Sequence, residues 1–354
     1  RFSLVTGVQT CALPISGEKM RKSHMTAVLP LTVLCAAFTA GCSAKQPYRH
    51  DSFTFDTLVS ITIYDVNGNS TAEEICKGAS GMLSALDDTL SRTKSDSLIA
   101  RINDNAYSSA VDVDAATYNM LKTCTQLSDL TDGAFDITLG NISDMWGFGK
   151  ENAVKPGDTE LKKLAGRKNY ENIVFNYYEQ TVAFSSDGFS IDLGAAAKGY
   201  AMDMMDTYLR DSGVTSAVVD FGGSILTIGD NNGERWNITI TADETNSPVG
   251  TLKVNEGYIA TSNGAKRFVE YDGVKYHHII DPETAYPADS GVKSCTVYSG
   301  SGLISDALST AFFVMGADKA KEFYDKYDIA EYVITLTDGT VIVSDGISAD
   351  FTAS

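Results

Sequence analysis

The segment between residues 217 and 298 most constrains the fold of this chain, because it holds seven short runs typical of strands and no helical pattern. The runs cover 217–220, 224–228, 236–241, 250–254, 258–261, 275–280 and 294–298, with turn residues between them. Short β-branched and aromatic runs bounded by turns predict strands. So many consecutive strands are incompatible with a doubly wound parallel sheet, in which helices alternate with strands.

Helical patterns stand on both sides of these strands. Residues 72–90, 115–130, 304–315 and 317–327 predict helices, residues 57–64 predict a strand, and residues 173–184 predict a hairpin. A last hairpin is expected around Asp338 and Gly339. The expected class is α+β, with mixed strands and helices around a sheet core, and no repeat or linker divides the chain.

Asp306 and Thr310 are spaced i, i+4 on a predicted helix, which places a carboxylate and a hydroxyl on one side of it. Such oxygens form half a site for a hard cation. The alternative is a helix-capping and packing pattern.

A second feature points to phosphate. Residues 191–200 run from a short strand into small residues and then Lys198, near the start of a predicted helix. Small residues let a diphosphate approach the backbone, and lysine supplies a positive charge, although the spacing is neither a Walker P-loop nor a Rossmann fingerprint. The alternative is a tight strand-to-helix turn.

Four motifs occur in this order: DITLGNISDMWGFG at 136–149, DLGAAAKGY at 192–200, HHIIDPETAYP at 277–287 and DALST at 306–310. Together they resemble the FAD:protein FMN transferase family, ApbE. The resemblance runs from about residue 53 to 343 and includes TSNG at 261–264 and DFGG at 220–223. It implies an α+β, T-fold-related architecture in a single domain over residues 53–354.

The resemblance also implies a reaction. FMN passes from FAD onto a threonine of an acceptor protein and AMP is released, with Mg²⁺ as the metal. Asp306 and Thr310 match side-chain ligands of that metal, which makes Asp306 a catalytic candidate, and Ala195 matches a backbone carbonyl ligand.

Several residues match positions that contact FAD in the family. They are Phe55, Thr93, Ala134, Phe135, Asp136, Asp192, Lys198 and Ile279. His278 is the candidate general base for the attacking hydroxyl. The alternatives are a structural His278 within a strand and a core role for Phe135.

The chain departs from the family pattern at four places. Phe55-Asp56-Thr57 replaces Met-Gly-Thr, Thr93 stands where an aromatic residue is frequent, and Leu303 replaces an acidic metal ligand of some members. Ala285 replaces a frequent glycine, a change of small cost unless its φ is positive.

The chain is strongly acidic. From residue 42 onward it has 24 Lys and Arg against 45 Asp and Glu, a formal charge of −21, which argues against nucleic acid as a partner.

The N-terminal residues are expected to lie outside the fold. Residues 1–19 contain a run similar to a translated sequencing adapter and are expected to be an artefact. Residues 20–41 resemble a lipoprotein signal peptide, with a basic start and an apolar run before Cys42. Lipidation of Cys42, including palmitate, and a tether over 42–52 would hold the protein outside the cytoplasm on the cell membrane. Ordinary secretion is the alternative.

Cys76, Cys124 and Cys295 remain and are expected to be buried free thiols, because their spacing matches neither a metal site nor a disulfide framework.

Two other functions stay open. One is an FAD-binding lipoprotein that hydrolyses FAD to FMN and AMP, and the other is a non-catalytic solute-binding lipoprotein. For a transferase, the resemblance suggests acceptors among extracytoplasmic subunits of membrane redox complexes and flavin reductases.

Overall fold

The computed structural model describes residues 46–151, 153–243, 247–265 and 267–354. Residues Pro47–Ser354 form one compact unit. The adapter-like run, the signal peptide and Cys42 lie outside the described residues. Among the described helices, none combines the length and apolarity needed to cross a bilayer.

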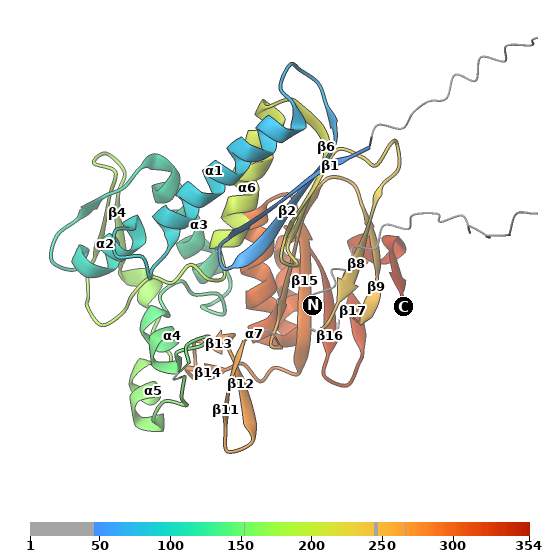
Figure 1. The fold of residues 1–354 in the computed structure, drawn as a ribbon. Coiled ribbons are helices and arrows are strands. Elements are labelled where there is room, and N and C mark those ends of the chain that lie inside the picture. Colours follow the sequence, from blue (N-terminus) through green and yellow to red (C-terminus); the bar gives the residue numbers. More distant parts are fainter. Residues whose placement is uncertain (1–45, 152, 244–246, 266) are drawn as a thin grey trace, which may run out of the picture. The chain divides into compact units, whose positions relative to one another are not determined.

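An eight-stranded sheet, antiparallel throughout, runs through the unit (Figure 1). In spatial order its strands are β1 (Tyr48–Thr54), β2 (Thr57–Val66), β6 (Val214–Phe221), β7 (Ile225–Ile228), β10 (Gly257–Asn263), β15 (Val292–Ser299), β16 (Glu331–Leu336) and β17 (Val341–Val343).

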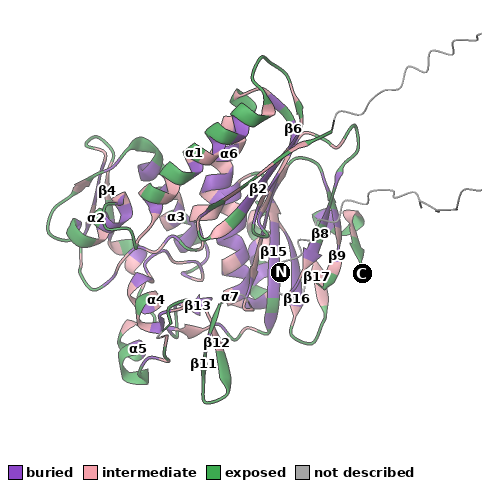
Figure 2. Cartoon of the chain, in the orientation of Figure 1, coloured by how far each residue is buried: buried purple, intermediate pink, exposed green. Residues whose placement is uncertain are grey.

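Three helices cover one face of this sheet. They are α1 (Ala72–Leu90), α6 (Ala197–Asp211) and α7 (Gly302–Tyr327). The other face packs on a three-stranded sheet of β8 (Trp236–Thr241), β9 (Pro248–Val254) and β18 (Phe351–Ala353). Because strand side chains alternate between faces, Tyr258 joins the helical core while Ile259 joins the core between the sheets. In Figure 2, buried residues (purple) gather where the helices meet the sheet, whereas the outer helix faces and hairpin ends are exposed (green).

Smaller elements surround this centre. One group comprises α2 (Leu98–Asn105), β3 (Val111–Asp112), α3 (Ala115–Leu130), η1 (Asn169–Asn172), β4 (Ile173–Asn176) and β5 (Thr181–Phe184). A second comprises α4 (Gly140–Trp146), α5 (Asp158–Leu164), β11 (Phe268–Tyr271), β12 (Val274–His277), β13 (Ile280–Asp281) and β14 (Tyr286–Pro287), and η2 (Asp345–Asp350) precedes β18. Trp146 is fully buried in the second group and donates to the Ala285 carbonyl.

Helices α6 and α7 cross with their backbones in close contact. A Cβ built on Gly199 would lie 2.3 Å from the Gly302 carbonyl oxygen, and one built on Gly302 would lie 2.2 Å from the Gly199 oxygen. Any larger residue at either position would force the helices apart. The crossing therefore requires glycine on both helices.

The predicted α+β class is confirmed, and helices 72–90 and 115–130 have the predicted bounds. The two C-terminal helices are joined as α7, with a break at Gly316, whose φ of 82° lies outside the helical region. The patterns missed α2, α4 and α5, which have only seven or eight residues each.

Two predicted boundaries were wrong. The strand expected over 275–280 is two strands, because β12 pairs with β11 whereas β13 pairs with β14. Residues 48–52, assigned to the tether, belong to β1, which pairs with β2 along its whole length. β1 is an edge strand of the sheet, and the alternation of half-buried and exposed residues along it follows from one covered and one exposed face.

Candidate active site

Asp306 lies where α7 crosses the start of α6. Its side chain is buried, with 5% of its surface exposed, and its Oδ2 accepts a hydrogen bond of 2.9 Å from the Gly199 amide. Gly199 is the third residue of α6, so its amide is one of the first-turn donors that have no partner within the helix. The carboxylate of α7 supplies the partner for this amide.

Asp203 makes the reciprocal contact from α6 to α7. Its carboxylate accepts from the amides of Gly302, at 2.6 Å, and Leu303, at 2.9 Å, and from the Ser301 hydroxyl. Burial raises the pKa of Asp203, and these hydrogen bonds oppose the rise. Each helix therefore supplies a carboxylate to the first turn of the other.

Thr310 lies one turn after Asp306 in a group of hydroxyls. Its Oγ1 is 3.1 Å from Ser262 Oγ, and Ser309 Oγ is 2.8 Å from the same atom. Ser262 belongs to β10 and to the TSNG motif, but its side-chain contact was not expected from the sequence. The DALST and TSNG motifs meet at these hydroxyls.

Three of the predicted residues carry oxygen donors of the type that a hard cation prefers. Asp306, Thr310 and Ala195 offer a carboxylate, a hydroxyl and a carbonyl, which are oxygen donors of the kind Mg²⁺ prefers. In the described part of the chain, no three His, Cys, Asp or Glu residues gather as a metal centre. A cation here would therefore need oxygens from its substrate or from water as well. Leu303 is buried in the core, so it adds no ligand.

The two histidines of the HHIID motif have different partners. His277 Nδ1 accepts from the Ile279 amide and Nε2 lies 3.0 Å from the Ala288 carbonyl, so Nε2 carries the proton. His278 Nδ1 lies 3.2 Å from the Arg267 carbonyl, so the proton is on Nδ1 and the Nε2 lone pair is free of that bond. His277 thus has a structural role, while His278 can accept a proton.

The environment keeps His278 neutral. Burial lowers its pKa to about 4, with the charges of Arg267 and Lys198 among the further causes. The Lys198 charge acts on His278 from the start of α6, so the structure brings these two predicted residues into one electrostatic environment.

Asp192 belongs to a charged network that includes Arg92, a residue without a predicted role. Arg92 Nε lies 3.0 Å from Asp192 Oδ2, and its two terminal nitrogens contact both Asp144 oxygens. The Asp192 amide donates to the Ile137 carbonyl at 2.7 Å, which joins the 192–200 motif to the 136–149 motif. Thr93 follows Arg92 directly and is exposed.

Asp136 has an unusual environment for a carboxylate. Its Oδ1 accepts from the amide and the hydroxyl of Thr138, whereas its buried Oδ2 has no hydrogen-bond partner. Burial raises the pKa of Asp136 to about 6, although the Thr138 bonds oppose the rise. The free Oδ2 is suited to accept a hydrogen bond from a ligand.

Two predicted FAD contacts have side chains in the core. Phe135 is 1% exposed and Ile279 is 6% exposed, so the Phe135 ring belongs to the hydrophobic core, as the alternative interpretation predicted. Only backbone atoms remain for a ligand at these positions. Ala134 and Phe55 are half-buried, and Phe55 lies in the turn between β1 and β2.

Ala285 has a positive φ, the condition under which replacing glycine by alanine lowers stability. Its φ is 59°, in the left-handed region, and its methyl group is fully buried in the cluster around Trp146. A non-glycine residue in this region costs on the order of 1 kcal/mol. The packing around Trp146 and the hydrogen bond to its indole offset that cost.

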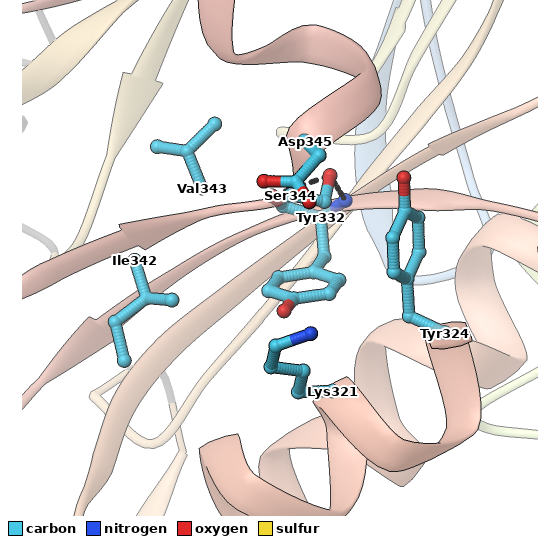
Figure 3. A pocket seen from close by; sticks show the side chains of 7 residues that line it. All are labelled: Lys321, Tyr324, Tyr332, Ile342, Val343, Ser344 and Asp345. Carbon is cyan, nitrogen blue, oxygen red and sulfur yellow. Dashed lines mark hydrogen bonds between the residues drawn. The ribbon is translucent and has the colours of Figure 1, made fainter.

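Two hollows lie apart from the α6–α7 crossing. A cavity of about 90 Å³ is lined by Lys321, Tyr324, Tyr332, Ile342, Val343, Ser344 and Asp345 (Figure 3). A wider one of about 430 Å³ is lined by Asp88 and Lys94–Ser97, directly after Thr93 in sequence. Neither hollow is lined by a predicted site residue.

Residues 55–334 match the model of the ApbE family. The chain belongs to the ApbE family. It is 29% identical over 332 residues to FAD:protein FMN transferase of Treponema pallidum, covering 89% of this chain and 92% of that protein. It is 30% identical over 305 residues to the Vibrio cholerae protein of the same name, covering 84% and 91%. The resemblance seen in the four motifs is thereby confirmed.

Solved structures agree with this family. The ApbE protein of Thermotoga maritima superposes with a TM-score of 0.78 at 30% identity, covering 86% of this chain and 99% of that one. The flavin transferase ApbE of Vibrio cholerae gives a TM-score of 0.76 at 27% identity, covering 86% and 99%. The α+β architecture is therefore that of the ApbE family.

We predict that His278→Gln lowers kcat for transfer by roughly a hundredfold or more, because it removes a proton acceptor. His277→Gln is the matched control and should lower Tm more than kcat, since its ring bonds only to backbone groups. Parental kcat in His278→Gln would exclude His278 as the base.

The same ring supplies a pH test. Because its folded pKa of about 4 lies below the ordinary value near 6.5, His278 should stay neutral from pH 7 down to about 5. Between about pH 6.5 and pH 4 the unfolded chain therefore binds more protons than the folded chain. Protonation of this group thus lowers the free energy of unfolding as pH falls through that range. An NMR titration with a midpoint near 6.5 would contradict this assignment.

Proposed function

We propose that this protein is an FAD:protein FMN transferase that moves FMN from FAD onto a threonine of an acceptor protein and releases AMP. Family membership supports flavin transfer. The proposed site rests on the start of α6, where Asp306 accepts from the Gly199 amide and where Lys198 supplies a charge that acts on a neutral His278. This arrangement offers charge for a diphosphate and a base for a hydroxyl.

The proposed reaction is a single phosphoryl transfer. The acceptor threonine oxygen forms a bond to the FMN-side phosphorus, and the bond from that phosphorus to the bridging oxygen breaks. His278 Nε2 takes the hydroxyl proton, and AMP departs with the bridging oxygen. The chemistry depends mainly on position and charge.

Lys198 and the turn before α6 would hold the diphosphate, because the ammonium group balances part of its charge. Asp192 and Asp136 would bind other polar groups of FAD, and the free Oδ2 of Asp136 supports a contact from a ligand donor. Asp306, Thr310 and the Ala195 carbonyl would hold Mg²⁺. When bound, Mg²⁺ neutralises diphosphate charge and so makes the phosphorus more reactive.

We further propose that the protein is lipid-anchored outside the cytoplasm, with acceptors among membrane redox subunits and flavin reductases. The signal-like run before Cys42 supports the anchor. The acidic balance of the chain agrees with a protein acceptor and with no nucleic acid partner.

Product analysis tests the function. The mature protein, FAD, Mg²⁺ and an acceptor domain should give AMP and an acceptor heavier by one FMN, with little free FMN. The acceptor variant with Thr→Ala should gain no mass. Free FMN formed at the rate of AMP, with no mass added to the parental acceptor, would instead identify a hydrolase.

The metal site has a separate test. Asp306→Asn keeps an acceptor oxygen for the Gly199 amide but removes the negative charge. We expect transfer to fall roughly a hundredfold or more with little change in Tm. EDTA should abolish parental transfer and added Mg²⁺ should restore it. Asp203→Asn, the control, should lower Tm while transfer remains metal-dependent. Full activity of Asp306→Asn, or of the parent in EDTA, would refute the assignment.

The anchor is tested by cell fractionation. Cys42→Ser should shift the protein from the membrane fraction to the soluble fraction or leave it unprocessed, because two acyl chains are needed for stable attachment. The purified mature domain should have the same transfer rate with either residue. Membrane partitioning equal to that of the parent would refute lipidation at Cys42.

A further inference from the structure

We infer that Arg92 is a positioning residue that holds the FAD site in its binding geometry. This inference rests on the proposed function. Arg92 follows α1, and its side chain is only 17% exposed although it bears a full charge. A buried guanidinium requires carboxylate partners, and its partners come from two distant parts of the chain.

The guanidinium joins three chain segments. Nη1 and Nη2 contact Asp144 of α4 at 2.9 and 3.1 Å, and Nε contacts Asp192 at 3.0 Å. The other Asp192 oxygen accepts from the Gly194 amide at 3.0 Å. Both oxygens of Asp192 are thus held, one by Arg92 and one by its own turn. A lysine lacks the planar fork needed for all three contacts.

The position of Asp192 affects the phosphate end of the site. The turn at 192–194 continues directly into Ala195 and Lys198, so a movement of Asp192 would displace the proposed metal and diphosphate contacts. Arg92 also fixes this turn to Asp144 of the 136–149 motif. One side chain therefore positions the proposed FAD contacts of the 192–200 motif against a second motif.

Charge balance adds a second reason. Lys150 contacts Asp144 at 3.3 Å, so two cations face the two carboxylates Asp144 and Asp192. Without Arg92, Lys150 would still contact Asp144, but Asp192 would lose its ion pair and would present an unbalanced charge to an anionic ligand. The loss should weaken FAD binding more than it slows phosphoryl transfer.

The test compares two arginines. Arg92→Gln should raise the FAD Kd, measured by flavin fluorescence, and the FAD KM by roughly tenfold to a hundredfold, with kcat within about threefold of the parent. The matched control is Arg210→Gln. Arg210 also contacts two carboxylates, Asp206 at 2.8 Å and Glu256 at 2.9 Å, but lies at the far end of α6 from Lys198. Its FAD Kd should remain parental.

A rescue variant separates positioning from general stability. Adding Asp144→Asn to Arg92→Gln removes the repulsion between carboxylates and should recover at least about threefold in FAD affinity. If Arg92→Gln does not fold, as judged by circular dichroism, Arg92→Lys in the same titration should give an intermediate Kd. Comparing Arg92→Gln with and without Asp144→Asn tests the charge of the network, and comparing Arg92→Lys with the parent tests its geometry.

The outcomes are distinguishable. If the parent binds FAD and transfers FMN but Arg92→Gln has an FAD Kd within about twofold of the parent, only this inference is overturned. An equal loss in Arg210→Gln, or no recovery with Asp144→Asn, also overturns it. A parent that binds no FAD overturns both this inference and the proposed function.

Discussion

The backbone contact between Gly199 and Gly302 is the constraint on which the site depends. Two helices can approach this closely only where both lack a Cβ, and the short distance lets each helix reach the first turn of the other. Asp203 then accepts from α7 and Asp306 accepts from α6. Residues about a hundred positions apart in the chain are thereby held within one hydrogen bond of each other.

This contact also determines the electrostatics of the site. An open helix N-terminus attracts anions, but here a carboxylate already occupies the first turn of each helix. A diphosphate placed beside buried Asp306 would meet a like charge, so its binding needs added positive charge. Lys198 supplies one charge, and a divalent cation held by Asp306 would supply the rest. Desolvation, together with the nearby positive charges of Arg267 and Lys198, keeps His278 neutral and able to accept a proton.

Two groups of contacts fix the segments that carry the predicted site residues, one made of aromatic rings and one of charged side chains. Trp146, Tyr276 and Tyr286 pack together beneath the HHIID motif, and the left-handed Ala285 is held there by burial and by the indole hydrogen bond. On the other side, Arg92 ties the turn before α6 to α4. The aromatic cluster and the charged network are each built from segments distant in sequence.

The sequence by itself determined the α+β class, the bounds of α1 and α3, the family motifs and the residue types that a flavin transferase needs, since periodicity and short motifs are local properties. It did not indicate Arg92, Asp203 or Ser262, because their partners lie 47 to 100 residues away and no local pattern records such contacts. It also left two interpretations open for Phe135, an FAD contact or a core residue, and two for His278, a general base or a structural residue. Tertiary structure placed the Phe135 ring in the core and lowered the pKa of His278, because burial depends on what the whole chain packs around a residue.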